Sequence, residues 1–157
     1  FVQQEDQVML VSQMGQSLRT KVSDIRPMGR AASGVRGIKL KADDMLVGVG
    51  ILRDGETDRQ LLVVTENGYG KKTKLEEYKT QGRGGMGIKT LNVTEKTGAL
   101  IGAKVVGPDD SELLAISAQS QVIRTPIDSV STLGRATQGV RIMKMRADDT
   151  VASFTLM

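Results

Sequence analysis

The side chains of this sequence that could do chemistry are mainly lysines and arginines that return at fixed intervals. Arg30, Arg83 and Arg135 each follow a glycine, and they are spaced 53 and 52 residues apart. Positive charge that recurs at regular spacing suits a ligand whose negative charges are also evenly spaced, as the phosphates of a nucleic acid are. The chemistry that these residues favour is therefore binding of a polyanion.

Catalytic and metal-binding chemistry has little support in the sequence. Histidine and cysteine are both absent, which excludes the usual zinc sites and the Ser-His and Cys-His nucleophile pairs. The acidic residues mostly lie in turn-like contexts such as Asp43-Asp44. We therefore expect no catalytic residue, no metal site and no cofactor in this chain.

The sequence also bears on the compartment of the protein. No segment approaches the roughly 20 apolar residues of a membrane-spanning helix, and the first residues lack the basic and apolar parts of a signal peptide. The absence of cysteine fits a reducing compartment, so we expect a cytoplasmic protein without a membrane partner. Because the chain begins with Phe1, we expect it to be a piece of a longer protein.

The glycine-arginine pairs belong to a repeat that runs through the whole chain. Thr20, Thr73 and Thr125 show the same spacings of 53 and 52 residues. The turn 41–44 recurs, with Lys replaced by Arg, at 146–149. So many coincident offsets indicate repeated structural units, which must stack on one another to bury a core.

Each repeat has the pattern of short strands. Val8–Val11 and Leu61–Val64 are apolar runs of strand length, and Leu18–Val22 alternates apolar and polar residues. About four such runs in about 50 residues match a propeller blade. The sequence therefore predicts an all-β fold, a β-pinwheel or propeller-like array of four-stranded antiparallel blades. Its three repeats, all part of one domain, span about 7–53, 59–106 and 111–157.

Charge is segregated in the same way within each repeat. Residues 19–41 carry a net charge of +6, and residues 71–89 and 124–146 carry +4 each, so the rest of the chain carries −10. Equivalent segments of stacked blades lie on one rim, which predicts a curved basic track for duplex DNA. Aromatic residues make up only 3% of the chain, which argues against a stacking platform for single strands. The alternative is that these lysines and arginines lie on solvent-exposed strand faces and serve only to keep the protein soluble. The predicted DNA contacts are Arg19, Lys21, Arg30, Arg36, Lys39, Lys71, Lys72, Lys74, Arg83, Lys89, Arg124, Arg135, Arg141 and Lys144.

A glycine-rich loop interrupts the second repeat. It consists of Gln81, Gly82, Arg83, Gly84, Gly85, Met86 and Gly87. Its glycines could let backbone N–H groups approach a phosphate, or they could supply the positive φ of a sharp connection between blades, and the two roles are compatible. Other residues are expected to be structural: Tyr69 and Tyr78 within the fold, and Met86, Met143 and Met145 between blades.

The repeats resemble the C-terminal domain of the bacterial DNA gyrase A subunit. That family carries a Gly-Arg-x-x-x-Gly-(Val/Ile)-(Arg/Lys) pattern, which begins here at Gly29, Gly82 and Gly134. Loop 81–87 is similar to the family's Gln-Arg-Arg-Gly-Gly-(Lys/Arg)-Gly box, with Gly82 and Met86 at positions where the box has basic residues. It therefore resembles a degenerate copy from a later blade.

The resemblance implies a role without catalysis in this segment. It implies a β-pinwheel that wraps double-stranded DNA on its outer basic rim and so supports negative supercoiling by an ATP-dependent type IIA topoisomerase. The implied partners are the gyrase B subunit together with the remainder of the gyrase A subunit, in a nucleoid-associated bacterial enzyme. Two alternatives remain: the equivalent domain of topoisomerase IV, which sets substrate preference, and a protein-binding β-propeller module.

Overall fold

The computed structural model describes residues 1–25, 28 and 30–157, and these residues form strands and short turns without an α-helix. The strands are β1 (Gln7–Ser12), β2 (Gln16–Lys21), β3 (Leu46–Leu52), β4 (Gln60–Thr65), β5 (Tyr69–Lys74), β6 (Thr80–Gln81), β7 (Ile88–Lys89), β8 (Leu100–Val106), β9 (Glu112–Ser117), β10 (Val122–Pro126), β11 (Val140–Arg141) and β12 (Val151–Leu156). Single 3₁₀ turns, η1 (Val22–Asp24), η2 (Leu75–Glu77) and η3 (Ile127–Ser129), follow β2, β5 and β10. The predicted all-β class is confirmed.

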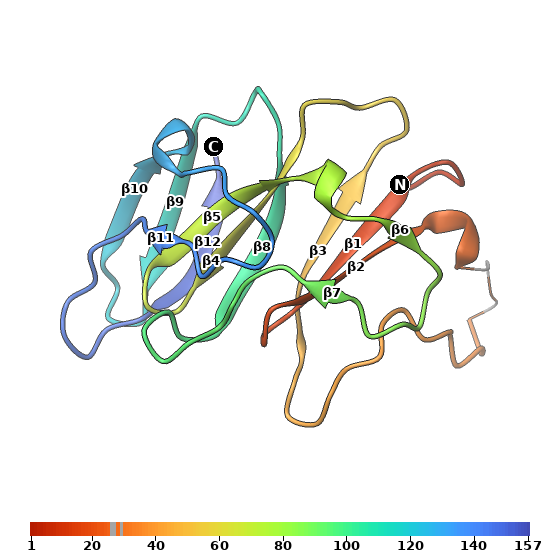
Figure 1. Cartoon of the computed structure of the whole chain (residues 1–157), viewed down its shortest axis with the longest axis horizontal. Coiled ribbons are helices and arrows are strands. Elements are labelled where there is room, and N and C mark those ends of the chain that lie inside the picture. Colours follow the sequence, from red (N-terminus) through yellow and green to blue (C-terminus); the bar gives the residue numbers. More distant parts are fainter. Residues whose placement is uncertain (26–27, 29) are drawn as a thin grey trace.

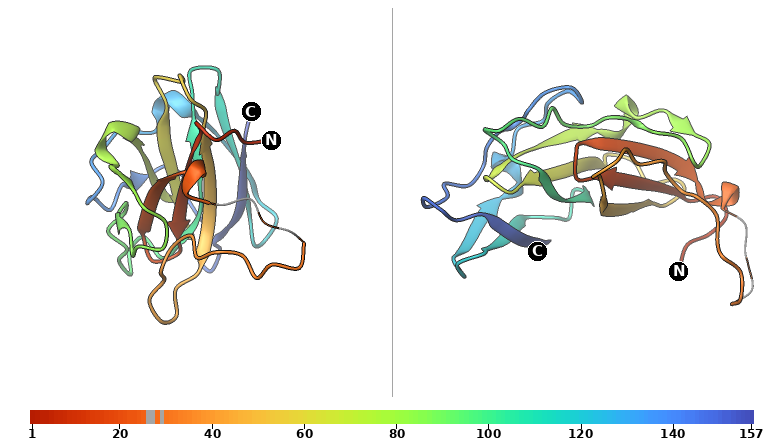
Figure 2. Two further views of the ribbon diagram at one scale, coloured as in Figure 1. Left: turned by 90° about the vertical axis from the view of Figure 1, so that its right-hand side faces the viewer. Right: turned by 90° about the horizontal axis from the view of Figure 1, so that it is seen from below.

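The strands form three sheets that lie side by side, one for each repeat (Figure 1). In each sheet the first strand of the repeat is central and pairs antiparallel with the next strand and with the last strand of the repeat. We call the sheet of β1, β2 and β3 blade 1, that of β4, β5 and β8 blade 2, and that of β9, β10 and β12 blade 3. The right-hand view of Figure 2 shows the blades following one another along an arc.

The sequence predicts four strands from each repeat, but the outermost strands of the first two blades come from the repeat that follows. Blade 1 is completed by β6 and β7 of the second repeat, which pair with β2, and blade 2 is completed by β11 of the third repeat, which pairs with β5 (Figure 1). The pairing of β6 is parallel, not antiparallel. The physical reason is that η2 turns the chain away from β5, so the following segment lies along the preceding blade and pairs its open edge.

The blades pack closely along their inner strands because glycine is present where a side chain would collide. A Cβ atom placed on Gly48 of β3 would lie 2.9 Å from the Cβ atom of Ala103 in β8. At the next contact, a Cβ atom on Gly102 of β8 would lie 2.8 Å from the Phe154 ring of β12. Gly48 and Gly102 pair with equivalent residues, Val11 and Val64, in their own sheets. Glycine at this repeat position therefore sets the distance between blades.

Blade 2 is buried on both faces, which explains why Leu61–Val64 is an uninterrupted apolar run. Leu61 and Val63 pack into a core shared with blade 1, and Leu62 and Val64 pack into a second core shared with blade 3. A strand covered on both sides has no polar face. This arrangement makes blade 2 the central layer of the array.

The residues expected to be structural mostly lie in these cores. Tyr78 is buried in the first core, Met143 in the second, and Met145 packs against the second. Met86 is the exception, because its side chain is 46% exposed, so the prediction that it packs between blades is wrong. It lies in loop 81–87, which runs over the outer edge of blade 1.

A hydroxyl group closes the first hairpin of every repeat. The side chains of Ser12, Thr65 and Ser117 accept hydrogen bonds from the backbone N–H groups four residues later, at distances of 3.0–3.1 Å. All three hydroxyl residues are buried. A short hydroxyl side chain at a hairpin end supplies the acceptor that the turn backbone lacks, which accounts for the Ser/Thr that recurs at this repeat position.

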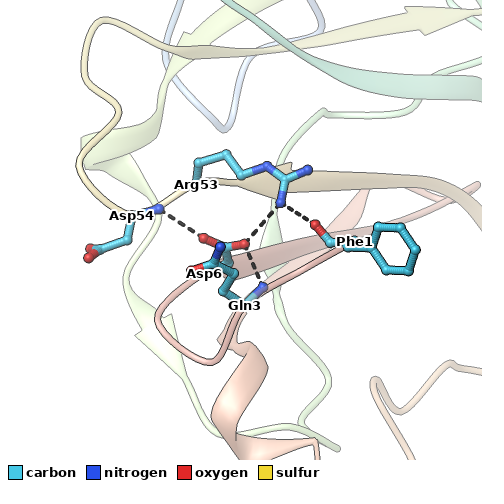
Figure 3. A network of polar contacts seen from close by, with 5 residues as sticks. All are labelled: Phe1, Gln3, Asp6, Arg53 and Asp54. Atoms are coloured by element: carbon cyan, nitrogen blue, oxygen red, sulfur yellow. Dashed lines mark hydrogen bonds and ion pairs between the residues drawn. The ribbon is translucent and has the colours of Figure 1, made fainter.

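The start of the chain is tied to the end of β3 by Asp6 (Figure 3). Its carboxylate accepts hydrogen bonds from the backbone N–H groups of Gln3 (2.9 Å) and Asp54 (3.0 Å), and it pairs with the Arg53 guanidinium at 3.2 Å. The pKa of Asp6 lies below its ordinary value. The largest cause is the hydrogen bond from the Gln3 backbone, and the Asp54 backbone and the Arg53 charge add to it.

Replacing Asp6 with Asn should lower the thermal stability of the protein at neutral pH. A lowered pKa in the folded state stabilises the fold above the unfolded pKa of 3.8, and this contribution is lost as pH falls through the folded value. Thermal unfolding of both proteins from pH 7 to pH 2 should show a difference in Tm that shrinks below about pH 3.8. The control is Asp54→Asn, because Asp54 contributes only its backbone N–H group. A pH-independent difference would contradict this account.

Candidate nucleic-acid interface

The structure divides the fourteen predicted DNA contacts by exposure. Exposed side chains belong to Lys21, Arg30, Arg36, Lys39, Lys74, Lys89, Arg124, Arg141 and Lys144. Half-buried side chains belong to Arg19, Lys72, Arg83 and Arg135. Lys71 alone among the fourteen is buried. Gly29, which precedes Arg30 in the repeated glycine-arginine pair, lies outside the described residues.

Exposed cations recur at one register position on the outer edges of the blades. Lys89 of β7 pairs with Gln16 at the start of β2, and Arg141 of β11 pairs with Tyr69 at the start of β5. Both strands come from the following repeat and cover the edge of the preceding blade. Blades 1 and 2 therefore each carry a cation at an equivalent point of the outer edge.

The arginines of the glycine-arginine pairs hold these outer segments in place. The Arg83 guanidinium donates to the carbonyl oxygens of Asp24 (3.0 Å) and Arg36 (3.3 Å). The Arg135 guanidinium donates in the same way to the carbonyl oxygen of Lys89, at 3.0 Å. Each arginine thus binds the backbone of the exposed cation one repeat earlier. Their described contacts are structural and orient Arg36 and Lys89.

Lys71 is buried, so the prediction that it is an exposed DNA contact is wrong. Its side chain is 0% exposed, and its ammonium group donates to the carbonyl oxygens of Gly134 (2.6 Å), Arg135 (2.8 Å) and Thr137 (2.9 Å) and to the Thr137 hydroxyl (3.0 Å). Burial lowers the pKa of Lys71 to about 8; Glu77 opposes this shift and Arg135 adds to it. The residue fastens the third repeat onto blade 2.

Arg19 is likewise engaged between blades. Its guanidinium donates to the Gln7 side chain and to the carbonyl oxygens of Leu75 (2.8 Å) and Tyr78 (3.2 Å). Burial lowers the pKa of Arg19, and the Glu76 carboxylate opposes that effect. The alternation of charged and apolar residues in the sequence could not separate this interblade role from an exposed one.

Arg124 is exposed but paired with an acid. Its Nε atom lies 3.1 Å from Oε2 of Glu112 on the neighbouring strand β9. At the same two repeat positions, blade 1 has Arg19 and Gln7, and blade 2 has Lys72 and Gln60. The neighbouring carboxylate lowers the positive potential of blade 3 at this point.

Loop 81–87 makes a close connection to blade 1. Gly84 and Gly87 have φ values of +83° and +77°, and a Cβ atom on Gly87 would lie 2.2 Å from the carbonyl oxygen of Ser17. The N–H group of Gly84 donates to the carbonyl oxygen of Gly37 at 2.6 Å. The geometry at Gly84 and Gly87 therefore fits the connection role, in which glycine allows a conformation that other residues rarely adopt.

One exposed cation near this edge was missed by the sequence analysis. Lys96 lies in the turn between β7 and β8, and its Nζ atom is 5.7 Å from the centre of the Tyr69 ring. Arg141 lies 5.5 Å from the same ring. Lys96 has the repeat position of Asp43 and Asp148. The second repeat thus has a positive residue where the other two have an acidic one, and this difference in the sequence could have identified Lys96.

Comparison with known proteins identifies the family. The family model of the DNA gyrase C-terminal domain, described as a β-propeller, matches residues 6–53, 59–107 and 111–156. The chain belongs to the DNA gyrase C-terminal domain family. Its three matched segments cover nearly the whole sequence, one for each repeat.

Curated relatives agree with this family. The DNA gyrase A subunit of Mycolicibacterium smegmatis is 46% identical over 149 residues, which is 94% of this chain and 17% of the relative. The DNA gyrase A subunit of Streptomyces coelicolor is 41% identical over 153 residues, or 96% of this chain and 17% of the relative. The chain thus spans about a sixth of the length of these relatives.

Solved structures confirm the fold of the family. A DNA gyrase A C-terminal domain superposes with a TM-score of 0.86 at 31% identity, covering 99% of this chain and 52% of that one. The C-terminal domain of a DNA topoisomerase IV superposes with a TM-score of 0.88 at 22% identity, covering 98% and 47% of the two chains. The second likeness shows the shared fold alone. In the part of the chain that the structure describes, no helix is long and apolar enough to span a membrane.

Replacing Lys71 with Met should destabilise the array by about 1–3 kcal/mol, because the oxygens that surround its ammonium group would lose a buried donor. Chemical denaturation should show the loss in the free energy of unfolding. Hydrogen exchange should show faster exchange around residues 132–137. The control is Lys72→Met, since Lys72 is half-buried and its ammonium makes none of the described hydrogen bonds. Equal losses in both variants would argue against the interblade role of Lys71.

Proposed function

We propose that this chain binds duplex DNA along the outer edges of its blades and holds the duplex in a curve. The observation that carries the proposal is the recurrence of an exposed cation, Lys89 and then Arg141, at the same register position on successive blades. Lys21, Arg36, Lys39, Lys74 and Lys144 add exposed positive charge in the same repeat segments. Duplex DNA presents evenly spaced phosphates that suit such repetition.

The expected contacts are to the DNA backbone and not to base edges. The described residues form no α-helix that could enter a major groove. Lysine and arginine contacts to phosphates position a duplex without specifying its sequence. The affinity of the proposed binding should therefore fall steeply as salt rises and depend little on the DNA sequence.

The proposed bend follows from the arrangement of the blades along an arc (Figure 2). Bending 20–30 base pairs through 40–90° costs on the order of 1–6 kcal/mol. The few phosphate contacts of a single blade offset little of that cost, whereas contacts on successive blades add up along one duplex. Wrapping is thus a property of the array.

In the whole enzyme, this segment would serve supercoiling without catalysing it. We propose that DNA wound on these blades is presented to the gyrase B subunit together with the remainder of the gyrase A subunit, the parts that carry ATP hydrolysis and cleavage. The duplex held in this curve gives strand passage its direction toward negative supercoils. The gyrase A subunits at 41–46% identity support this assignment.

Charge reversal at the equivalent outer positions should weaken duplex binding. Arg36→Glu, Lys89→Glu and Arg141→Glu, made one at a time, should each lower the slope of log affinity against log salt by about 0.9. Fluorescence anisotropy on a labelled duplex over a salt series measures both the slope and the affinity. The matched control is Lys104→Glu, which changes the net charge equally on the inner strand β8. An equal effect of the control would show that only total charge matters.

Bound DNA should be bent, and affinity should rise steeply with the number of blades. A duplex of roughly 40 base pairs with a dye at each end should show increased energy transfer on binding, since the cost of curvature is offset by contacts on successive blades. A longer repeat array of the same family should bind more tightly and shorten the end-to-end distance further. Tight binding to DNA that stays straight, or a large preference for one sequence, would contradict the wrapping mechanism.

A further inference from the structure

A cluster of two cations around one buried aromatic ring lies at the outer edge of blade 2. Tyr69 begins β5 and is only 5% exposed. Arg141 pairs with it from β11, and its guanidinium donates to the Tyr69 hydroxyl at 3.3 Å. Lys96 reaches the same ring from the turn before β8, with Nζ 5.7 Å from the ring centre. These three residues line a shallow surface pocket together with residues 138–140.

The two cations have no acidic partner of their own. The ion pairs found among residues 1–25, 28 and 30–157 join Arg53 with Asp6, Arg59 with Glu56, and Arg124 with Glu112. The electron-rich face of Tyr69 attracts both cations toward one place, although their charges repel each other. An anion bound between them would remove that repulsion.

This cluster is specific to the second blade. The repeat position of Tyr69 is occupied by Gln16 and Gln121, and that of Lys96 by Asp43 and Asp148. At the outer edge of blade 1, Lys89 stands in place of Arg141, opposite Gln16 and without an aromatic ring. Blade 1 therefore has one cation beside Gln16 where blade 2 has two beside Tyr69. The turn 41–44 of blade 1 carries a net charge of −1, whereas the equivalent turn 94–97 of blade 2, in which Glu95 precedes Lys96, carries none.

We propose that Lys96 and Arg141 bind a backbone phosphate of duplex DNA at this point, with the Tyr69 ring holding the two cations in place. The inference rests on the proposed DNA binding and adds to it a residue of the turn between β7 and β8, outside residues 71–89, which carry the other proposed contacts of the second repeat. Arg141 offers several N–H donors and Lys96 a point charge, a combination that suits a phosphate. Because the phosphate is common to all sequences, the site binds without regard to sequence.

The test compares Lys96→Gln and Lys96→Asp with wild type on a labelled random duplex of roughly 40 base pairs. Lys96→Gln should weaken binding and lower the salt slope by less than the roughly 0.9 of a whole phosphate contact, because Arg141 still contacts the shared phosphate. Lys96→Asp, which restores the charge of the other repeats, should weaken binding further. Lys96 is exposed, so both variants should keep the wild-type Tm.

The matched control is Lys104→Gln. Lys104 also lies over an aromatic ring, at 5.6 Å from the centre of Phe154, but on the inner strand β8. Its substitution should leave the slope unchanged. Equal losses for the Lys96 and Lys104 variants would overturn the site, because they would report net charge alone.

Failure of the site can be told apart from failure of the proposed function. If Arg141→Gln lowers the slope and Lys96→Gln does not, the Lys96 site is wrong while DNA binding on the outer edges stands. If the wild-type chain shows no salt-dependent binding to duplex DNA, both the site and the proposed function are overturned.

Discussion

The structure depends on one constraint: the open outer edges of blades 1 and 2 need hydrogen-bond partners, and the repeat that follows each blade supplies them. The outer strands β2 and β5 pair with short segments of the repeat that follows, which bring Lys89 to blade 1 and Arg141 to blade 2. The same pairing that satisfies the backbone of one blade therefore positions the exposed charge of the next repeat. Fold and candidate interface share a single set of contacts.

Cations consequently have two roles that are adjacent in space. Arg19, Lys71, Arg83 and Arg135 donate to backbone carbonyl groups across repeats and stabilise the outer segments. The exposed cations project from the segments that are held in this way. A buried ammonium group such as that of Lys71 is tolerable only because several oxygens surround it. These internal contacts limit the movement of the outer edge and so preorganise the charges on it.

Much of the fold could be predicted from the sequence, because a repeat displays each constraint more than once. The hydroxyl groups of Ser12, Thr65 and Ser117 mark hairpin ends through contacts with the backbone four residues later. The apolar run Leu61–Val64 marks a strand that is covered on both faces. The origin of the fourth strand could not be predicted in this way. A segment such as 88–89 has the same sequence pattern whether it pairs within its own sheet or crosses to the preceding one.

The sequence by itself determined the class of fold, the number of repeats and the segregation of charge, because periodicity and composition are properties of the chain. Only the tertiary structure decided which cations are exposed. Lys71 and Lys72 are neighbours of the same type, yet one is buried by the third repeat and the other is half-exposed. Likewise, Lys96 and Arg141 are 45 residues apart and meet only at the Tyr69 ring. Burial and proximity between distant segments arise from the packing of one repeat on another, which no local pattern encodes.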